Sequence, residues 1–250
     1  MNSKGLAVIV LAAGKGTRMK SPVAKVLHPI KNQPLLYYVL ESLVPLNPDF
    51  SILVVGFQSE VVKESFSDRG LIFVEQKEQL GTGHAAEQAK LALHDFSGDV
   101  LVVCGDMPLI KSQTLVDLVE KHREKKSACT VLTLKSSEKK DFGLVIRDEK
   151  GLVSKIVEHK DASKSQKKVD EFNAGVYCFD KYLFSKALDG IDDNNIQKEY
   201  YLTDTIEYMV SNGFLVESLQ ITDNTQLLGI NTQEDLSLAE KILMGETRSS

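Results

Sequence analysis

The chain has 250 residues, of which 42% are hydrophobic and 26% are charged, a composition typical of soluble globular proteins. This length can bury the core of one large α/β domain or of two smaller domains. The formal net charge is −5 and the sequence pI is about 5.6, which argues against a general nucleic-acid-binding protein. Since no apolar run approaches the roughly twenty residues of a transmembrane helix, we expect no membrane or nucleic-acid partner, and no protein partner is implied.

Positive charge is concentrated near the N-terminus, where the first forty residues hold six Lys or Arg residues and no Asp or Glu residue. Residues 6–12 are a continuous apolar run rich in β-branched residues, which predicts a strand buried on both faces. The next segment, residues 13–25, is called the basic loop below. Its Ala and Gly residues let main-chain N–H groups approach an anion closely. Its basic side chains, which favour a polyphosphate ligand, are Lys15, Arg18, Lys20 and Lys25.

Three other interpretations of this stretch are disfavoured by its spacing. A dinucleotide-binding fingerprint requires a third glycine where Met19 stands, and an acidic residue after the next strand, where Gly56 stands. A P-loop fails because Gly14-Lys15 is followed by Gly16. A secretory signal is disfavoured because the apolar run is only about seven residues long. A glycine-rich turn with solvated lysines stays open until the rest of the chain is considered.

Strands and helices alternate through the first half of the chain. Apolar runs predict strands at 6–12, 52–55, 71–75 and 99–104. Helical patterns occur between and after them, at 35–46, 60–66, 84–94 and 112–126. This alternation is typical of a parallel, doubly wound sheet that binds ligands at the carboxyl ends of its strands. Ala13, Gln76 and Asp106 each follow one of these strands, so we expect them at the ligand-binding edge.

The second half of the chain has an α+β character. Strands are predicted at 128–135, 143–147, 152–157, 171–179 and 214–221. A hairpin turn is predicted at 148–151, an exposed loop or lid at 160–168, and helices at 203–210 and 233–243. We expect a nucleotide lobe up to about residue 127 and a substrate lobe over about 128–245.

The cysteines and histidines show no metal-ligand or disulfide spacing. Cys104, Cys129 and Cys178 are widely separated and each lies in an apolar run. We therefore expect buried, reduced thiols and a cytoplasmic protein. The five histidines have no spacing that indicates a metal site, so surface or hydrogen-bonded histidines are expected.

Several polar residues at strand ends carry candidate chemistry. Asp106 follows an apolar strand and suits a Mg²⁺ ion that is held mainly by substrate phosphates, although Gly-Asp is also a common turn. Gln76 offers an amide donor and acceptor to a nucleobase or is an ordinary strand-end residue. Glu158 ends a strand beside a histidine and a lysine. Asn173 lies within an apolar strand, where an amide usually has a ligand or a network partner.

The segment LAAGKGTRM at 11–19, with Pro22 and Lys25, resembles the signature of sugar-1-phosphate nucleotidyltransferases. Later segments, in order and at close spacing, narrow the resemblance to the bacterial N-acetylglucosamine-1-phosphate uridylyltransferases. They are QLGTGHA at 79–85, GDMPL at 105–109, IVEHKDA at 156–162, NAG at 173–175, EYYLTD at 199–204 and GIN at 229–231. The resemblance covers about residues 5–245.

This resemblance implies a Rossmann-like, glycosyltransferase-A-like fold: a mainly parallel sheet flanked by helices, with an α+β sugar-binding lobe. It implies one nucleotidyltransferase domain over 1–250 without the left-handed β-helix acetyltransferase domain of the family. The implied reaction transfers UMP from UTP to N-acetylglucosamine 1-phosphate with Mg²⁺ as cofactor. The products are pyrophosphate and UDP-N-acetylglucosamine, a precursor of peptidoglycan and lipopolysaccharide.

The resemblance also implies roles for particular residues. The implied nucleotide-binding positions are Leu11, Ala12, Ala13, Gly14, Lys25, Gln76, Gly81, Thr82, Gly105 and Asp106. Arg18 and Lys25 match positions that neutralise phosphate charge during catalysis. Asp106 and Asn231 match the Mg²⁺ ligands. The implied sugar-binding positions are Gly143, Glu158, Asn173 and Asn231, with Tyr201 and Thr203 as neighbours.

One segment departs from the family pattern. The family usually has Gly-Tyr-Gly-Arg where this chain has Asp-Phe-Gly-Leu at 141–144, so a hydroxyl and a guanidinium are missing beside the implied sugar site. The nucleotide assignment is therefore better founded than the sugar assignment. The alternatives are a related nucleotidyltransferase that uses another nucleotide or acceptor phosphate, and a sugar-nucleotide sensor that binds without catalysis.

Overall fold

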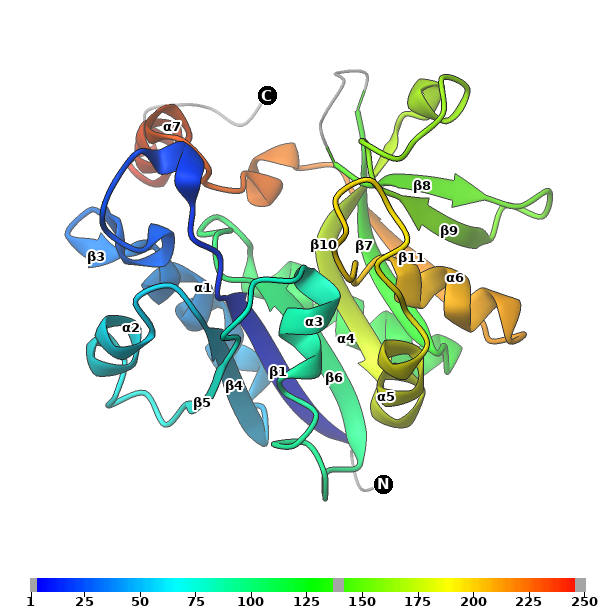
Figure 1. Ribbon diagram of the computed structural model, residues 1–250, viewed down its shortest axis with the longest axis horizontal. Helices are drawn as coiled ribbons and strands as arrows, with labels where there is room; N and C mark the ends of the chain where they lie inside the picture. The colour runs from blue at the N-terminus through cyan, green and yellow to red at the C-terminus, as the bar shows by residue number, and fades with distance from the viewer. Residues whose placement is uncertain (1–3, 137–141, 246–250) are drawn as a thin grey trace.

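The computed structural model describes residues 4–136 and 142–245, and its centre is a mixed sheet of nine strands with helices on both faces (Figure 1). The main path of the sheet runs β11-β7-β10-β6-β1-β4-β5, and β8 and β9 join it through β10. The strands of this sheet are β1 (Gly5–Ala12), β4 (Phe50–Val55), β5 (Ile72–Glu75), β6 (Gly98–Cys104), β7 (Cys129–Lys135), β8 (Leu144–Arg147), β9 (Val153–Val157), β10 (Glu171–Asp180) and β11 (Val216–Ile221). A separate two-stranded ladder joins β2 (Pro29–Ile30) and β3 (Gln33–Pro34).

The helices cover the two faces of the sheet as the alternation of side chains along β1 requires. Val8 and Val10 face one buried cluster, while Ala7 and Ile9 face the other, because successive side chains of a strand point to opposite faces. The first cluster receives α1 (Leu35–Leu43), α2 (Ser59–Ser65) and α4 (Ser112–Lys125). The second receives α3 (Thr82–Glu87), α5 (Lys181–Asp189) and α6 (Asp204–Ser211).

The four strands of the first half form the predicted parallel unit. β1 pairs in parallel with β4 and β6, and β4 pairs in parallel with β5. Helix α3 is shorter than the predicted 84–94 segment, because after Glu87 the backbone continues in turns such as the one closed by Ala89 N–H on the Ala86 carbonyl. The parallel strands place their carboxyl ends along one edge, as the doubly wound pattern predicts.

The second half extends this sheet. β10 runs antiparallel to both β6 and β7, and β11 runs parallel to β7. The β8–β9 hairpin turns at the predicted residues, where Gly151 adopts a positive φ of 81°. Helix α5 was not predicted, because it follows β10 without a loop. The last residue of β10, Asp180, is also the N-cap of the helix, and its carboxylate accepts the N–H groups of Tyr182 and Leu183.

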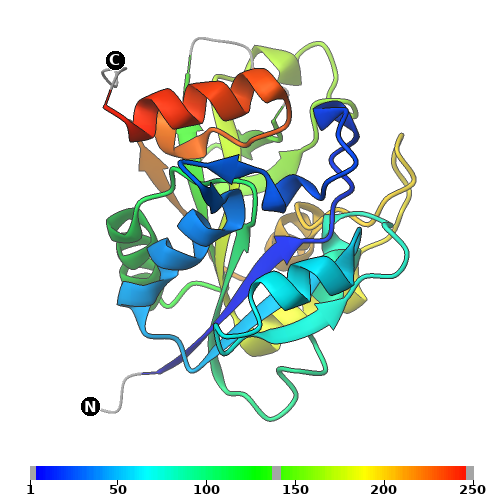
Figure 2. The same cartoon turned by 90° about the vertical axis from the view of Figure 1, so that its left-hand side faces the viewer.

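The last helix, α7 (Gln233–Leu243), has the predicted bounds and returns to the N-terminal part of the chain. In Figure 2 it lies above the N-terminal segment that contains β2 and β3. Met19 of the basic loop is buried in a small cluster with Ile230 and Ala239. The C-terminal segment therefore packs against the basic loop. The division into nucleotide and sugar lobes remains a proposal, since both halves share one sheet.

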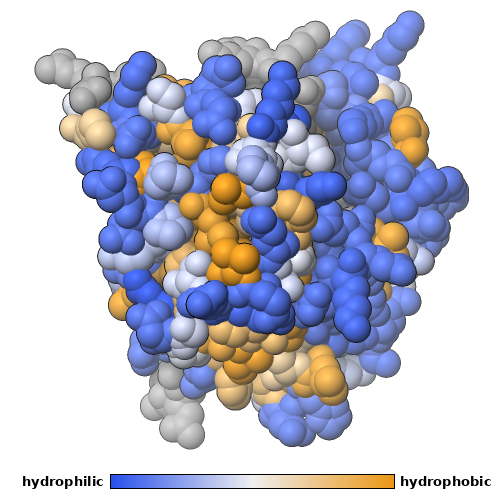
Figure 3. Space-filling model, turned by 60° about the vertical axis from the view of Figure 1, so that its left-hand side comes forward, coloured by the Kyte–Doolittle hydropathy of each residue, from blue (hydrophilic) through white to orange (hydrophobic). Residues whose placement is uncertain are grey.

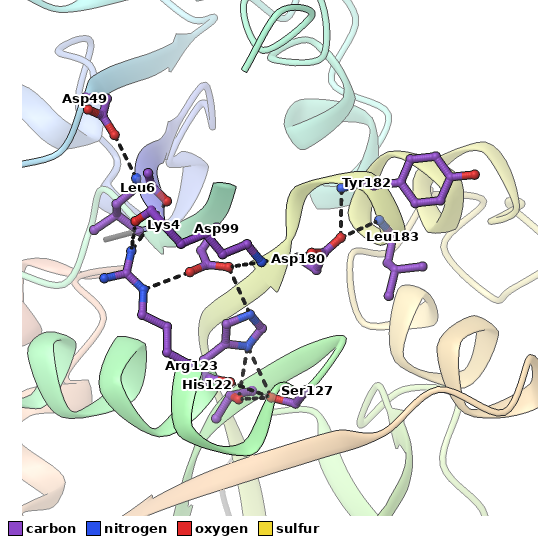
Figure 4. Close-up of polar contacts among 12 residues, drawn as sticks. Lys4, Leu6, Asp49, Asp99, His122, Arg123, Ser127, Asp180, Tyr182 and Leu183 are labelled. Atoms are coloured by element: carbon purple, nitrogen blue, oxygen red, sulfur yellow. Dashed lines mark hydrogen bonds and ion pairs between the residues drawn. The ribbon is translucent and has the colours of Figure 1, made fainter. Parts of the chain in front are cut away.

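A buried carboxylate at the other end of the sheet links four segments (Figure 4). Asp99 has no exposed surface, and it pairs across the ladder with Leu6 at the start of β1. Lys4 Nζ lies 2.7 Å from Asp99 Oδ1, and Arg123 Nε donates to Asp99 Oδ2 at 2.8 Å. Burial alone would raise the pKa of Asp99, but hydrogen bonds from His122, Lys4 and Arg123 lower that pKa to about 2. This cluster stabilises the fold at a distance from the basic loop.

The surface is mainly hydrophilic on the face shown in Figure 3, with hydrophobic residues gathered near its centre. Among the helices of residues 4–136 and 142–245, none is long and apolar enough to cross a membrane. The three cysteines are free, as predicted. Cys129 and Cys178 are buried, whereas Cys104 is only partly buried.

Candidate active site

The carboxyl ends of β1, β5 and β6 meet at a hollow of about 320 Å³. The Gly105 N–H donates to the Leu11 carbonyl at 2.9 Å, which fixes the end of β6 against the end of β1. The Gln76 N–H donates to the Val55 carbonyl at 2.8 Å and so continues the ladder past β5. The lining residues are Leu11, Ala12, Ala13, Gly14, Lys25, Val26, Gln76, Gln79, Gly81, Thr82, Ala85, Cys104, Asp106 and Glu199. The structure thus brings together nine of the ten residues predicted for the nucleotide, with Gly105 directly behind.

The basic loop presents free backbone donors beside this hollow. Within the described part of the chain, no hydrogen-bond acceptor is paired with the main-chain N–H groups of residues 14–18. Gly16 has φ 62° and ψ 42°, the left-handed conformation that lets consecutive N–H groups converge on an anion. A Cβ at Gly16 would lie 2.7 Å from Lys25 Cβ, so this glycine also allows Lys25 to approach the loop.

Two side chains of the basic loop and two from distant parts of the chain form one charged cluster. Lys25 Nζ forms an ion pair with Asp106 Oδ2 and donates to Asn231 Oδ1 at 3.2 Å. Arg18 donates to the same Asn231 oxygen at 3.0 Å. The Ile230 N–H donates to the Asp106 carbonyl at 2.9 Å, which holds the Asn231 segment against the end of β6. The four residues predicted for catalysis and metal binding are therefore neighbours.

The donor set of this cluster fits a hard divalent cation. Asp106 Oδ2 and Asn231 Oδ1 both face one cationic atom, Lys25 Nζ, which stands where positive charge is favourable. A carboxylate and an amide oxygen are ligands that Mg²⁺ accepts, and Mg²⁺ commonly completes its shell with waters and substrate phosphates. Within residues 4–136 and 142–245 no group of three or more His, Cys, Asp or Glu side chains is arranged to hold a metal. A metal here would depend on these two oxygens and on the substrate.

The far end of the hollow suits a flat ring with both donor and acceptor groups. Gln76 is 4% exposed, and its Nε2 donates to the Gly81 carbonyl at 3.0 Å and contacts His84 Nδ1 at 3.1 Å. These contacts leave Oε1 of Gln76 as an acceptor. Gly81 has φ 111°, and a Cβ there would lie 2.5 Å from the Tyr200 carbonyl oxygen. Only glycine allows this close approach, which lets the backbone of residues 81–82 line the hollow.

Thr82 has a structural contact that the sequence did not suggest. Its Oγ1 accepts the Leu202 N–H at 3.1 Å, and the Gly83 N–H donates to the Tyr200 carbonyl at 2.7 Å. The start of α3 is thereby fixed to the 199–202 segment. This contact explains how Glu199 reaches the lining of the hollow.

The residues predicted for the sugar form a second group around Gly143. A Cβ at Gly143 would lie 3.5 Å from both Glu158 Oε1 and Asn173 Cβ, and 2.8 Å from Ile156. Thr203 Oγ1 donates to Glu158 Oε1 at 3.0 Å. Gly143, Glu158 and Asn173 are therefore neighbours, while Asn231 belongs to the charged cluster around Lys25.

Acidic side chains near this group hold their protons more tightly than usual. Burial raises the pKa of Glu158, and the nearby Asp161 and Glu199 carboxylates raise it further, although the Thr203 hydroxyl lowers it. Burial also raises the pKa of Asp204 to about 7, with Glu158 and Glu207 as the next causes. Acidic side chains are thus concentrated near the group around Gly143, whereas the basic loop concentrates positive charge.

Asn173 has the network partner that its place in an apolar strand predicts. Its Nδ2 donates to the Tyr177 hydroxyl at 2.6 Å, and its Oδ1 accepts the Gly175 N–H at 3.0 Å.

In the segment that departs from the family pattern, Asp141 lies outside the described residues, and Leu144 is 1% exposed in the core. The predicted loop at 160–168 is anchored to the 190–200 segment, because Asp161 Oδ1 accepts the Ile196 N–H at 2.9 Å.

Sequence reasoning did not assign binding roles to five residues that line the hollow: Val26, Gln79, Ala85, Cys104 and Glu199. Gln79 and Glu199 lie within motif segments, which was the available signal. Burial and the Asp106 carboxylate raise the pKa of Cys104 to about 12, so this thiol is neutral and a weak nucleophile.

A family model described as nucleotidyl transferase matches residues 7–225. The chain belongs to this family. The sequence-based assignment to the nucleotidyltransferases is therefore confirmed, and so is the resemblance to the uridylyltransferases, because the relatives below carry the name "Bifunctional protein GlmU".

The curated relatives of this nucleotidyl transferase are about 40% identical to it. The protein from Acetivibrio thermocellus is 42% identical over 238 residues, which cover 95% of this chain and 51% of the relative. The protein from Desulfotalea psychrophila is 40% identical over 238 residues, which cover 95% of this chain and 70% of the relative. The protein from Listeria monocytogenes serotype 4a is 41% identical over 235 residues and is covered to 51%. The chain spans about half the length of two of these relatives.

The fold of this nucleotidyl transferase also matches a solved structure. A UDP-glucose pyrophosphorylase complexed with UDP-glucose superposes with a TM-score of 0.75, covering 97% of this chain and 100% of the other. The sequence identity is 16%, so the match shows the fold alone. The predicted mainly parallel, helix-flanked nucleotidyltransferase fold is confirmed, with the antiparallel β10 making the sheet mixed.

Proposed function

We propose that this nucleotidyl transferase moves the UMP group of UTP to N-acetylglucosamine 1-phosphate, with pyrophosphate as the second product. The observation that carries this proposal is the combination of free N–H groups at residues 14–18 with the cluster of Arg18, Lys25, Asp106 and Asn231 at one edge of the sheet. The names of the curated relatives support the choice of substrates.

The proposed reaction is a direct displacement. A phosphate oxygen of the sugar phosphate attacks the α-phosphorus of UTP and forms a new P–O bond. The bond between the α-phosphorus and the bridging oxygen breaks, and pyrophosphate leaves with the electron pair. No base is required, because the attacking phosphate is already ionised. The protein therefore has two tasks: to align two polyanions and to stabilise the negative charge that spreads in the transition state.

The basic loop performs the electrostatic task in this proposal. The N–H groups of residues 14–18 bind triphosphate oxygens, and Arg18 and Lys25 neutralise their charge. Asp106 and Asn231 would hold Mg²⁺, which supplies further neutralisation of the phosphate oxygens when it is bound. Lys25 is free to turn to the phosphates once its contact with Asp106 is released.

Recognition of the base is assigned to the end of the hollow near Gln76. The Oε1 acceptor of Gln76 suits the ring N–H of uracil, because the Nε2 of the same amide is already bonded to Gly81 and His84. The N3 of a cytosine ring carries no hydrogen and would face this acceptor unfavourably. With Oε1 of Gln76 assigned to the ring N3 position, the proposal therefore predicts a preference for UTP over CTP.

Recognition of the sugar is assigned to Gly143, Glu158 and Asn173. These three residues are neighbours, and Glu158 can accept hydrogen bonds from sugar hydroxyls or from an acetamido N–H. Because Phe142 and Leu144 are apolar, this site offers fewer polar contacts than the family pattern. Glucose 1-phosphate is therefore the acceptor to compare.

The test is a screen of nucleotides against acceptors by pyrophosphate release in the presence of Mg²⁺. Four nucleoside triphosphates are each combined with N-acetylglucosamine 1-phosphate, glucose 1-phosphate and no acceptor. We expect the fastest release with UTP and N-acetylglucosamine 1-phosphate, and mass spectrometry identifies the sugar nucleotide. Faster release with CTP or with glucose 1-phosphate would replace the proposed substrates. Tight nucleotide binding without any release would favour the sensor.

A further inference from the structure

The peptide group between Ala13 and Gly14 is held from outside the basic loop. The Ala13 carbonyl accepts the Phe57 N–H at 3.2 Å and the side-chain Nε2 of Gln79 at 3.0 Å. Gly56 makes room for this carbonyl, because a Cβ there would lie 2.6 Å from the Ala13 oxygen. Two donors from the segments after β4 and β5 therefore fix the direction of one carbonyl group.

That direction determines where the next N–H group points. A trans peptide group is planar, and its C=O and N–H bonds point in opposite directions. When the Ala13 carbonyl faces Phe57 and Gln79, the Gly14 N–H must point away from them. Both Ala13 and Gly14 line the hollow, and no described residue accepts the Gly14 N–H. A free donor is thus held in a fixed direction at the place proposed for the triphosphate.

The Gln79 bond is not needed to satisfy the Ala13 carbonyl, since the Phe57 N–H already does so. Gln79 is an exposed residue, and fixing its long side chain costs conformational entropy. The second donor adds directional control of the peptide group, because two donors restrain the carbonyl more than one. Such restraint is useful where a donor must be aimed at developing charge before the reaction starts.

We propose that Gln79 is a positioning residue of this nucleotidyl transferase, which acts through the Ala13 carbonyl to aim the Gly14 N–H at the nucleotide phosphates. The proposal rests on the proposed function for its catalytic consequence. Its structural part, the direction of the Gly14 N–H, applies whichever nucleotide and acceptor the protein uses.

Two substitutions of Gln79 and one control test this role. Gln79→Met keeps the length of the side chain and removes the donor, whereas Gln79→Glu keeps the shape and replaces the donor by a carboxylate oxygen. The control is Gln113→Met, which removes an exposed glutamine that donates to Asp117 at 2.7 Å on α4. Gln113 does not line the hollow.

The expected result for Gln79→Met is a loss of roughly tenfold in kcat, because a misdirected donor stabilises the transition state less well. The dissociation constant of the nucleotide, measured by calorimetry, should change by less than about threefold, and the melting temperature should match that of Gln113→Met. A wild-type kcat in Gln79→Met would overturn the proposal. So would a loss confined to nucleotide affinity, since that result indicates a direct contact between Gln79 and the nucleotide.

A pH profile separates this role from a purely structural one. Protonation of the introduced carboxyl in Gln79→Glu restores an O–H donor to the Ala13 carbonyl. The deficit of this variant relative to wild type should therefore shrink as the pH falls from 7 towards the usual glutamate pKa of about 4.3. The deficit of Gln79→Met should stay constant over the same range. Equal profiles for the two variants would contradict the proposal.

One readout does not depend on the reaction. In the nucleotide-free protein, the amide resonance of Gly14 should shift in Gln79→Met and stay in place in Gln113→Met. If the Gly14 resonance moves but no substrate pair releases pyrophosphate, the proposed function fails and the positioning of Gly14 stands. If the wild-type protein releases pyrophosphate with the proposed substrates but the Gly14 resonance does not move in Gln79→Met, the proposed function stands and the role of Gln79 is refuted.

Discussion

Lys25 and Asp106 form an ion pair that joins the basic loop to the segment after β6, and the same ammonium group donates to Asn231 at 3.2 Å. The side chains of Lys25 and Asp106 are 13% and 22% exposed, so the pair is largely shielded from water. Asp106 and Asn231 supply the two oxygens that we propose as Mg²⁺ ligands. A divalent cation and the Lys25 ammonium group must therefore compete for the same position.

This competition predicts that Lys25→Met binds a divalent cation more tightly than wild type when no nucleotide is present. We expect roughly tenfold tighter binding of Mn²⁺, equivalent to about 1.4 kcal/mol, because the metal no longer displaces an ammonium group. Turnover should fall by orders of magnitude in the same variant. Electron paramagnetic resonance titration of Mn²⁺ measures the affinity directly.

The matched control is Lys20→Met, which removes a positive charge from an exposed residue of the basic loop. Its Mn²⁺ affinity should rise much less, because exposed charges are screened. Equal gains in both variants would attribute the effect to net charge. An unchanged affinity in Lys25→Met would contradict the competition.

Asp106→Asn should remove most of the activity and leave the fold intact. The amide keeps the shape of the carboxylate but loses the charge that attracts a divalent cation, so we expect turnover to fall by about two orders of magnitude or more. The stability cost should be small, about 1 kcal/mol, since the amide oxygen introduced by the substitution can still accept the Lys25 ammonium group. Wild-type Mg²⁺-dependent turnover in this variant would remove Asp106 from the metal site.

Asp204 should make the protein less stable as the pH rises through neutrality. Its pKa is about 7 in the folded chain, whereas the ordinary aspartate pKa is 3.8, so between these values the folded state binds more protons than the unfolded state. Stability then falls with rising pH over this window. Asp204→Asn should raise the melting temperature at pH 8 and leave it nearly unchanged below about pH 4. A destabilising effect of this substitution at pH 8 would argue against the shift.

Asp99 should contribute stability that is lost in acid. Its pKa is lowered to about 2, so its stabilising effect is present above the ordinary aspartate pKa of 3.8 and declines as the pH falls towards 2. Asp99→Asn leaves Lys4 and Arg123 without their buried counter-charge and should cost about 3 kcal/mol of unfolding free energy at pH 7. Urea denaturation measures the loss, and the kcat of the folded variant should remain that of wild type. A loss below about 1 kcal/mol would show that the network is not stabilising.

The elements of the first half could be predicted because local signals agree there. Residues 6–12 are apolar throughout and end at small residues. The structure has β1 at this place, paired in parallel with β4 and β6. In the second half, helix α7 also has the predicted bounds, and in the structure Thr232 and Asp235 form a capping box at its start. Local sequence sufficed where chain neighbours provide the partners.

Long-range pairing was less accessible from the sequence. The antiparallel insertion of β10 between β6 and β7 joins both halves in one sheet, and no local pattern specifies that order. Asn231 reaches Lys25 across 206 positions, and only the motif resemblance placed it in the site. The contact of Gln79 with Ala13 was not predicted, since a glutamine in a polar loop carries no signal of its acceptor.

The proposed site is tested most directly by the structure of the protein bound to UTP and Mg²⁺. We expect the triphosphate to lie against the N–H groups of residues 14–18, with its uracil ring at Gln76. We also expect the Lys25 ammonium group to contact the phosphates and no longer to pair with Asp106. A triphosphate bound elsewhere, or a Lys25–Asp106 ion pair that persists with nucleotide and metal both present, would contradict it.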